Sequence, residues 1–346
     1  MSNTNGNSPS SSDVEGVKKL GEARAQIVGE LRKVIVGMED VIDEVLISIF
    51  AKGHALLEGV PGLAKTLLVS SISECLSLEF HRIQFTPDLM PSDITGTEIL
   101  QDDPETGLRQ FKFSAGPIFS NILLADEINR TPPKTQAALL EAMQEKKITA
   151  GGSDYKLDLP FFVLATQNPL EQEGTYPLPE AQLDRFMFKI HVSYPSLAEE
   201  IAIMKSVTGT KSEKIEAVLS KEEILNLQEL VKRVPVADHI FNYVAAFVRS
   251  TRPDQPEAAD IVRNYVSWGA GPRACLNLIT SAKSRAILQG RFNVSIEDVK
   301  ALALPVMRHR IGLNFAAQSE GITTDTVIEK LLEAIPTNEK LYESAS

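Results

Sequence analysis

The stretch Gly59-Val60-Pro61-Gly62-Leu63-Ala64-Lys65-Thr66 decides the fold, because it lies between a short apolar run at 55–58 and a helix-like run at 66–76. Its glycines let backbone N–H groups turn toward an anion, and the helix start that follows adds the positive end of its dipole. In such a loop Lys65 would reach the β- and γ-phosphates of a nucleotide, and the Thr66 hydroxyl would hold Mg²⁺. The stretch therefore predicts a phosphate-binding loop.

One position departs from the usual residue pattern of such loops. Position 64 is alanine where glycine is common. We expect the backbone of Ala64 to stay right-handed, where a methyl group is tolerated. The alternative interpretation is a turn rich in glycine and proline before a helix that carries an exposed lysine.

A second stretch, Ile122-Leu123-Leu124-Ala125-Asp126-Glu127, is an apolar run that ends in two carboxylates. A metal–nucleotide site needs such a pair opposite its phosphate loop. Asp126 would orient Mg²⁺ and its waters, and Glu127 would polarise the attacking water. The alternative is a strand that runs into a solvated acidic turn.

The composition is that of a globular chain large enough for two domains. The sequence has 346 residues, of which 43% are hydrophobic and 23% charged. No apolar run is long enough to cross a bilayer, and residues 1–12 lack the blocks of a signal peptide, so we expect a cytoplasmic protein without membrane insertion. The net charge of −11 argues against broad binding to nucleic acid. Cys75 and Cys275 lie in apolar helical patterns, and the five histidines lack ligand spacing, so we expect no structural metal.

Short apolar runs alternate with helical patterns up to residue 191, which predicts a parallel sheet with helical crossovers. The expected strands are 55–58, 79–85, 122–126, 161–166 and 187–192, after two helices at 17–34 and 38–51. Two segments interrupt the alternation. Residues 87–119 predict a hairpin inserted in the helix after the second strand, and residues 147–159 predict another hairpin.

Past residue 196 the strand pattern stops, and helical periodicity predicts a separate domain. The expected helices are 197–207, 221–231, 236–250, 271–289, 295–310 and 323–334. We therefore expect a disordered tail at 1–15, a sheet domain at 16–194 and a helical domain at 195–346.

Three further polar residues stand at positions suited to phosphate chemistry. Asn168 follows an apolar strand, so its amide would reach the water or phosphate beside Glu127; alone, it would more often form an Asx turn. Arg185 ends a short helix before the last strand, either as a partner of Asp184 or as a group that stabilises charge at a subunit boundary. Arg273 opens a helix, where a cation opposes the dipole and needs an acidic or phosphate partner.

The chain resembles the MoxR family of AAA+ ATPases from about residue 17 to about residue 310. The stretches that carry the resemblance are Gly59–Thr66, Gly116–Phe119, Leu124–Gln136, Ala165–Pro169 and Glu180–Phe186. The resemblance implies an α/β fold: an αβα P-loop sandwich with a parallel sheet, followed by a small all-helical lid. The inserts resemble the helix-2 and pre-sensor hairpins of the clade that also holds magnesium-chelatase motor subunits.

The resemblance also implies roles for single residues. Asn168 would be the sensor on its strand, Arg185 the finger that acts on a neighbouring subunit, and Arg273 the lid sensor. Thr66 and Asp126 would hold Mg²⁺. The residues that would bind ATP are Val36, Gly37, Gly59, Val60, Pro61, Gly62, Leu63, Ala64, Lys65 and Thr66.

The function expected from the resemblance is Mg-dependent ATP hydrolysis in a ring, taken to be a hexamer. Such proteins remodel or mature a protein or metalloenzyme client, often with a partner that carries a von Willebrand factor A domain. One alternative is a nucleic-acid-stimulated motor or a magnesium-chelatase-like motor subunit. Another is a nucleotide-dependent interaction module with little turnover, which the set of Lys65, Asp126, Glu127 and Arg185 disfavours.

Overall fold

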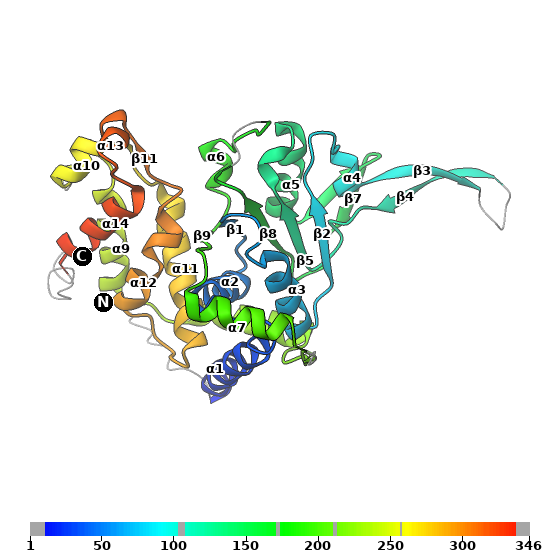
Figure 1. The fold of residues 1–346 in the computed structure, drawn as a ribbon, viewed down its shortest axis with the longest axis horizontal. Coiled ribbons are helices and arrows are strands. Elements are labelled where there is room, and N and C mark those ends of the chain that lie inside the picture. The colour runs from blue at the N-terminus through cyan, green and yellow to red at the C-terminus, as the bar shows by residue number, and fades with distance from the viewer. Residues whose placement is uncertain (1–10, 103–107, 171–173, 210–212, 257, 337–346) are drawn as a thin grey trace, which may run out of the picture. The chain divides into compact units, whose positions relative to one another are not determined.

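The computed structural model describes residues 11–102, 108–170, 174–209, 213–256 and 258–336. Within them the chain forms two compact units (Figure 1). The first unit is residues 30–221. The second unit combines residues 11–29 with residues 222–336. No helix in the described ranges is long and apolar enough to span a membrane.

A parallel sheet of five strands organises the first unit, in the order β2-β5-β8-β1-β9. The strands are β1 (Ala55–Glu58), β2 (Phe80–Gln84), β5 (Ile122–Asp126), β8 (Phe162–Gln167) and β9 (Phe188–His191). The register pairs Glu58 with both Gln167 and His191, and Gln84 with Asp126. The carboxyl ends of the strands therefore meet at one edge, which is where ligands bind in open α/β sheets. The five strands predicted from the sequence are confirmed to within one residue at each end.

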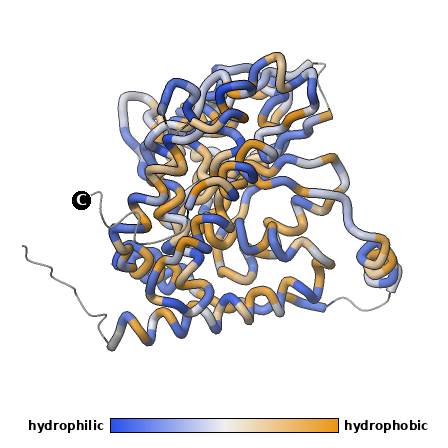
Figure 2. Tube along the Cα trace, turned by 90° about the vertical axis from the view of Figure 1, so that its left-hand side faces the viewer, coloured by the Kyte–Doolittle hydropathy of each residue, from blue (hydrophilic) through white to orange (hydrophobic). Residues whose placement is uncertain are grey.

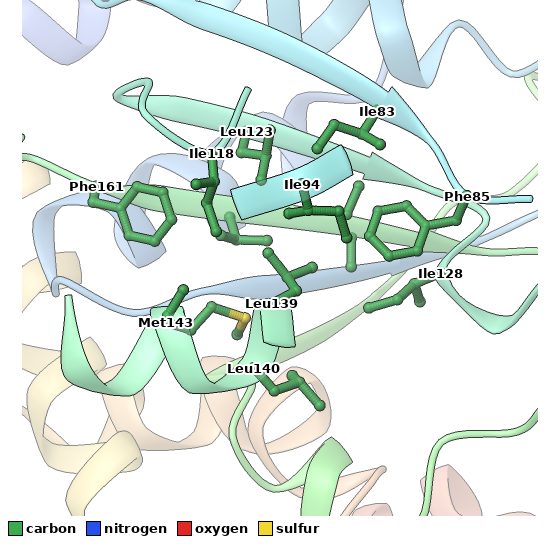
Figure 3. Close-up of a cluster of buried hydrophobic side chains, with 14 of the residues drawn as sticks. Ile83, Phe85, Ile94, Ile118, Leu123, Ile128, Leu139, Leu140, Met143 and Phe161 are labelled. Atoms are coloured by element: carbon green, nitrogen blue, oxygen red, sulfur yellow. The ribbon is translucent and has the colours of Figure 1, made fainter. Parts of the chain in front are cut away.

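The sheet is buried on both faces because alternate residues of its central strands are apolar on each side. One face packs on helix α5 (Pro133–Glu145) and the short α4 (Pro91–Thr95), where Ile94, Leu139 and Met143 meet Leu123 (Figure 3). Each such side chain contributes about 1.5–3 kcal/mol through its burial. On the sheet, α3 (Lys65–Cys75) contacts β5, and α2 (Glu39–Phe50) contacts β9.

Two hairpins interrupt the sandwich. The strands β3 (Gly96–Asp102) and β4 (Arg109–Ala115) form a ribbon that extends away from the sheet (Figure 1). The strands β6 (Lys147–Ala150) and β7 (Ser153–Lys156) form the second hairpin. Phe113 of the first stacks on Tyr155 of the second, with ring centroids 3.9 Å apart. Both predicted hairpins are confirmed, although the helix around the first is only α4, and the segment from 103 to 107 lies outside the described residues.

Three further elements complete the first unit. They are a 3-10 turn at Ile128–Arg130, α6 (Glu180–Leu183) and α7 (Leu197–Val207). Helix α7 starts where the sequence predicted, because Ser196 accepts from the Glu199 N–H and Glu199 in turn accepts from the Ser196 N–H, forming a capping box.

The second unit is mainly helical, as predicted. Hydrophobic and hydrophilic residues follow one another at short intervals along the described chain (Figure 2). Besides most of α1 (Ser11–Leu31), its helices are α8 (Lys221–Arg233), α9 (Asp238–Ser250), α10 (Asp260–Tyr265), α11 (Pro272–Leu288), α12 (Ile296–Met307), α13 (Phe315–Ser319) and α14 (Thr324–Ala334). Inside this unit the carboxylate of Asp298 is fully buried and paired with Arg285 and Arg291. Burial raises the pKa of Asp298, but hydrogen bonds from Arg291 and Ser295 outweigh it and hold the pKa below its usual range.

Besides the short helices α10 and α13, which were not predicted, three features of these elements differ from the expectations. Helix α1 (Ser11–Leu31) begins six residues before the expected helix, within the expected tail, of which residues 1–10 lie outside the described part. The lid holds a two-stranded ribbon of β10 (Val266–Trp268) and β11 (Gly312–Leu313), so it is not all-helical; strands this short leave no periodic signal. The compact units also differ from a division after residue 194, because α7 belongs to the first unit.

Candidate nucleotide-binding site

The phosphate loop connects β1 to helix α3, as its sequence predicted. Helix α3 begins at Lys65, so its first backbone N–H groups face the loop. The Lys65 ammonium is half-buried and donates to the backbone carbonyl of Gly59. Gly59 has no room for a side chain, since a Cβ there would lie 2.7 Å from the carbonyl oxygen of Val192. Burial lowers the pKa of Lys65, and the charges of Asp126 and other nearby carboxylates oppose this shift.

Ala64 corrects one expectation from the sequence. Its φ of 51° and ψ of 23° are left-handed, not right-handed. A left-handed backbone brings Cβ close to the following carbonyl oxygen and costs about 1–2 kcal/mol in a residue other than glycine. Ala64 is the N-cap residue of α3, directly before the first helical residue.

Replacing Ala64 with glycine is therefore expected to stabilise the first unit by up to about 1 kcal/mol, less than the full strain because glycine also gains freedom in the unfolded chain. Urea unfolding of the purified protein measures the change. A matched control is Ala137→Gly on the exposed face of α5, where the same replacement in a right-handed helix costs about 1 kcal/mol. Equal destabilisation by both changes would contradict the left-handed assignment.

The carboxylate of Asp126 ends strand β5 and is held on both oxygens. Thr166 of β8 donates its hydroxyl to Oδ1 at 2.6 Å. Arg82 of β2 donates to Oδ2 through Nη2 at 2.7 Å and through Nε at 3.1 Å. The side chain is thus oriented by its two neighbouring strands before any ligand arrives.

Glu127 lies just past the same strand end, in a left-handed conformation with φ of 57°. Its backbone N–H donates to the Thr166 hydroxyl at 2.8 Å. Its Oε2 accepts from Gln84 of β2 at 2.7 Å and pairs with Arg130 Nε at 3.1 Å. The left-handed turn directs the side chains of Asp126 and Glu127 to the same cavity.

That cavity has a volume of about 470 Å³. It brings together most of the residues expected from the sequence to handle phosphate and metal. Its lining is Pro61, Gly62, Leu63, Ala64, Lys65, Thr66, Arg82, Gln84, Asp126, Glu127, Thr166 and Asn168. The cavity therefore combines the Lys65 ammonium and the start of α3 with the two oriented carboxylates of Asp126 and Glu127.

A second cavity, of about 610 Å³, adjoins the first through the shared loop residues Gly62, Leu63 and Ala64. Val36 and Gly37, which the resemblance assigns to the adenine, line it. Further lining comes from His191 at the end of β9, from residues 192–195 after it, and from Ile203 and Val207 of α7. Its wall is mainly apolar, as a cavity for a flat base requires.

A charged cluster lies at the carboxyl end of β1, and its His191 lines the second cavity. Glu58 is bonded to Lys189 at 2.8 Å and to His191 at 3.0 Å, both from β9. Burial raises the pKa of Glu58, but the bond from His191 and the charge of Lys189 outweigh it and hold the pKa at about 2. The carboxylate is therefore ionised at neutral pH and adds negative charge near Lys65.

The remaining candidate residues occupy three different settings. Asn168 is buried and lines the phosphate-side cavity, while its side-chain oxygen also accepts from the Leu170 N–H in an Asx turn. Arg185 is half-buried in the turn after α6, and it does not line either of these two cavities as the described residues form them. Arg273 is exposed at the second position of α11 and belongs to the second unit.

Sequence reasoning missed four polar residues of the site: Arg82, Gln84, Arg130 and Thr166. Two of them, Arg82 and Gln84, could have been predicted from the alternating pattern of strand β2. In Arg82-Ile83-Gln84-Phe85 the polar residues alternate with residues buried in the core, so both polar side chains face the same side of the sheet. The pairing of β2 with β5 then places them beside the acidic pair.

Two family models match the chain. Residues 54–188 match the ATPase family associated with various cellular activities (AAA), and residues 258–331 match the AAA lid domain. The first region contains the phosphate loop and the acidic pair, and the second covers the part of the helical unit from α10 into α14.

Proteins of known name and structure are similar over nearly the whole chain. Chaperone MoxR1 of Mycobacterium tuberculosis is 41% identical over 321 residues, which are 93% of this chain and 84% of that protein. Protein MoxR of Methylorubrum extorquens is 28% identical over 91% of this chain. A crystal structure of an ATPase candidate from Cytophaga hutchinsonii has a TM-score of 0.87 at 43% identity, covering 94% of this chain and 97% of that one. The chain therefore belongs to the MoxR family of AAA ATPases.

Proposed function

We propose that the chain binds ATP across the two adjoining cavities, hydrolyses it with the help of Mg²⁺, and uses the cycle to remodel a protein client. The observation that carries this proposal is the convergence of Lys65, Thr66, Asp126 and Glu127 in one cavity. A second, mainly apolar cavity beside Val36 and Gly37 shares the loop residues Gly62, Leu63 and Ala64 with it.

The residues present fit a nucleotide and a divalent cation. The half-buried ammonium of Lys65 and the N-terminus of α3 supply positive charge for phosphates. Hydroxyl and carboxylate oxygens are the protein ligands that Mg²⁺ prefers, and Thr66 and Asp126 provide them. When bound, the cation would neutralise charge on the β- and γ-phosphates.

Within this proposal the chain's own residues have separate tasks. Lys65 holds the phosphates, and Glu127 accepts the proton of the attacking water. Asn168 orients that water from the end of β8. Arg185 acts on the nucleotide of the next subunit in a ring. Arg273 is the sensor residue of the lid and contacts the bound nucleotide.

The client-level proposal rests on the relatives. One similar protein is called a chaperone, and we extend that role to this chain as the remodelling or maturation of a protein or metalloenzyme client in the cytoplasm. We place the chain in a hexameric ring that works with a partner carrying a von Willebrand factor A domain.

A nucleic-acid motor is disfavoured by the charges of the second hairpin. Lys147 is bonded to Asp154 at 2.6 Å, across the hairpin itself. At the end of the same insert, Asp158 pairs with Lys221. Lys147 is thus neutralised within the hairpin, which does not favour the displacement of counterions from a nucleic-acid backbone.

Phosphate release from ATP by the purified chain tests the proposal. We expect turnover with Mg²⁺ and none when a chelator removes it. Lys65→Ala is expected to weaken ATP binding about 10- to 100-fold, because the phosphates lose a charged hydrogen-bond donor. The exposed Lys205 of α7 gives a matched control, and Lys205→Ala is expected to behave as the native chain. Native affinity of Lys65→Ala in calorimetry would show that the loop is not the site.

A further inference from the structure

Arg82 is a charged residue of the site to which no role has yet been given. It lies on edge strand β2, and its neighbour Ile83 points the other way, into the core (Figure 3). Its Nη2 and Nε lie 2.7 and 3.1 Å from Asp126 Oδ2, and Nη2 also donates to Gln84 Oε1 at 2.7 Å. Arg82 also lines the phosphate-side cavity, together with Lys65.

This arrangement conflicts with a cation at Asp126. Thr166 already donates to Oδ1, and Arg82 takes Oδ2. A divalent cation beside Oδ2 would face the guanidinium at contact distance, where two positive charges repel strongly. A cation that binds at Oδ2 therefore requires Arg82 to move, whereas one at Oδ1 would share that oxygen with Thr166, since a carboxylate oxygen has two lone pairs.

Arg82 is the donor that is able to move. Thr166 is only 1% exposed, and its hydroxyl is also fixed by the N–H of Glu127. The Arg82 side chain is 45% exposed and sits on a long flexible stem. The planar fork of a guanidinium fits a phosphate as well as a carboxylate, and the phosphates proposed above would share its cavity.

We propose that Arg82 is a further nucleotide-binding residue. It neutralises Asp126 while no cation is present, and it turns to the phosphates of the nucleotide when Mg²⁺ takes its place at Asp126. This inference rests on the proposed function, because it needs a magnesium nucleotide in the phosphate-side cavity.

The competing interpretation is that Arg82 only ties β2 to β5 through Asp126. When Mg²⁺ is present, the two interpretations predict opposite effects of removing Arg82 on the affinity for a nucleotide. If Arg82 only links the two strands, its removal frees Asp126 for the cation, and the affinity for a magnesium nucleotide stays equal or rises. If Arg82 turns to the phosphates, its removal weakens that affinity.

The test is calorimetric binding of a slowly hydrolysed ATP analogue to the full chain with Mg²⁺ in excess. Arg82→Ala is expected to weaken binding about tenfold, the low end for the loss of a charged hydrogen bond. Arg82→Lys, which keeps the charge without the fork, is expected to recover part of the loss. The control is Arg109→Ala, since Arg109 is an exposed arginine paired with Asp102 on the first hairpin.

Equal or tighter binding by folded Arg82→Ala overturns the inference. Thermal unfolding checks each variant, and Arg82→Gln, which keeps a donor for Asp126, replaces the alanine variant if that one does not fold. Lys65→Ala in the same titration separates two kinds of failure. If Lys65→Ala loses binding while Arg82→Ala does not, only the role of Arg82 is wrong. If Lys65→Ala binds as the native chain does, the proposed site itself is wrong.

Discussion

Glu127→Gln is expected to bind ATP as the native chain does and to hydrolyse it about 10²- to 10⁴-fold more slowly, which is the usual contribution of a general base. The amide has the shape of the carboxylate and keeps an oxygen for the bond from Gln84, but it cannot take a proton from water. Phosphate release and equilibrium binding, measured on the same preparation, separate the two effects.

The matched control is Glu141→Gln, an exposed residue of α5 outside both cavities. It is expected to leave turnover and binding unchanged. Near-native turnover by Glu127→Gln would contradict the role of base, and Glu127 would then serve only to fix the end of β5 through Gln84 and Arg130.

Arg185→Ala is expected to bind ATP nearly normally and to lose hydrolysis by about 10³- to 10⁵-fold, which is the range for an arginine finger supplied by another subunit. Arg185 lies in the turn after α6 and outside the lining of the phosphate-side cavity. Its charge would therefore reach the γ-phosphate of a neighbouring subunit rather than its own.

Asp184→Ala tests the structural alternative for Arg185. If the arginine is only a partner of Asp184, removal of either residue gives the same loss of turnover and the same fall in stability. The finger assignment predicts that Asp184→Ala retains most of its turnover. It also predicts that turnover per subunit rises with protein concentration, because the site is complete only in an assembly. Full activity of dilute monomers would contradict it.

Much of the site was predictable because each part of it is carried by a continuous stretch of sequence. The loop Gly59–Thr66 and the strand end at Asp126 and Glu127 each combine an apolar run with polar residues directly after it. Parallel strands bring their carboxyl ends to one edge, so two such stretches predict one site. The structure places both stretches around the same cavity.

Other features depend on contacts between distant segments, which a single stretch does not contain. The bonds from Arg82 and Gln84 to the acidic pair follow from the register of β2 on β5, and no local pattern sets that register. The left-handed backbone of Ala64 at the start of α3 was also not predictable, because local preference favours a right-handed alanine. The ribbon of β10 and β11 joins segments more than 40 residues apart, each too short for a periodic signal.

The central claim is that hydrolysis takes place at a site shared by two subunits, and mixing two inactive variants tests it most directly. Lys65→Ala subunits bind the nucleotide about 10- to 100-fold more weakly but keep Arg185, and Arg185→Ala subunits hold the nucleotide but lack the finger. We predict that an equimolar mixture releases phosphate well above the sum of the two variants measured alone. Native mass spectrometry verifies that mixed assemblies form. Mixed assemblies with no gain in phosphate release would contradict the shared site.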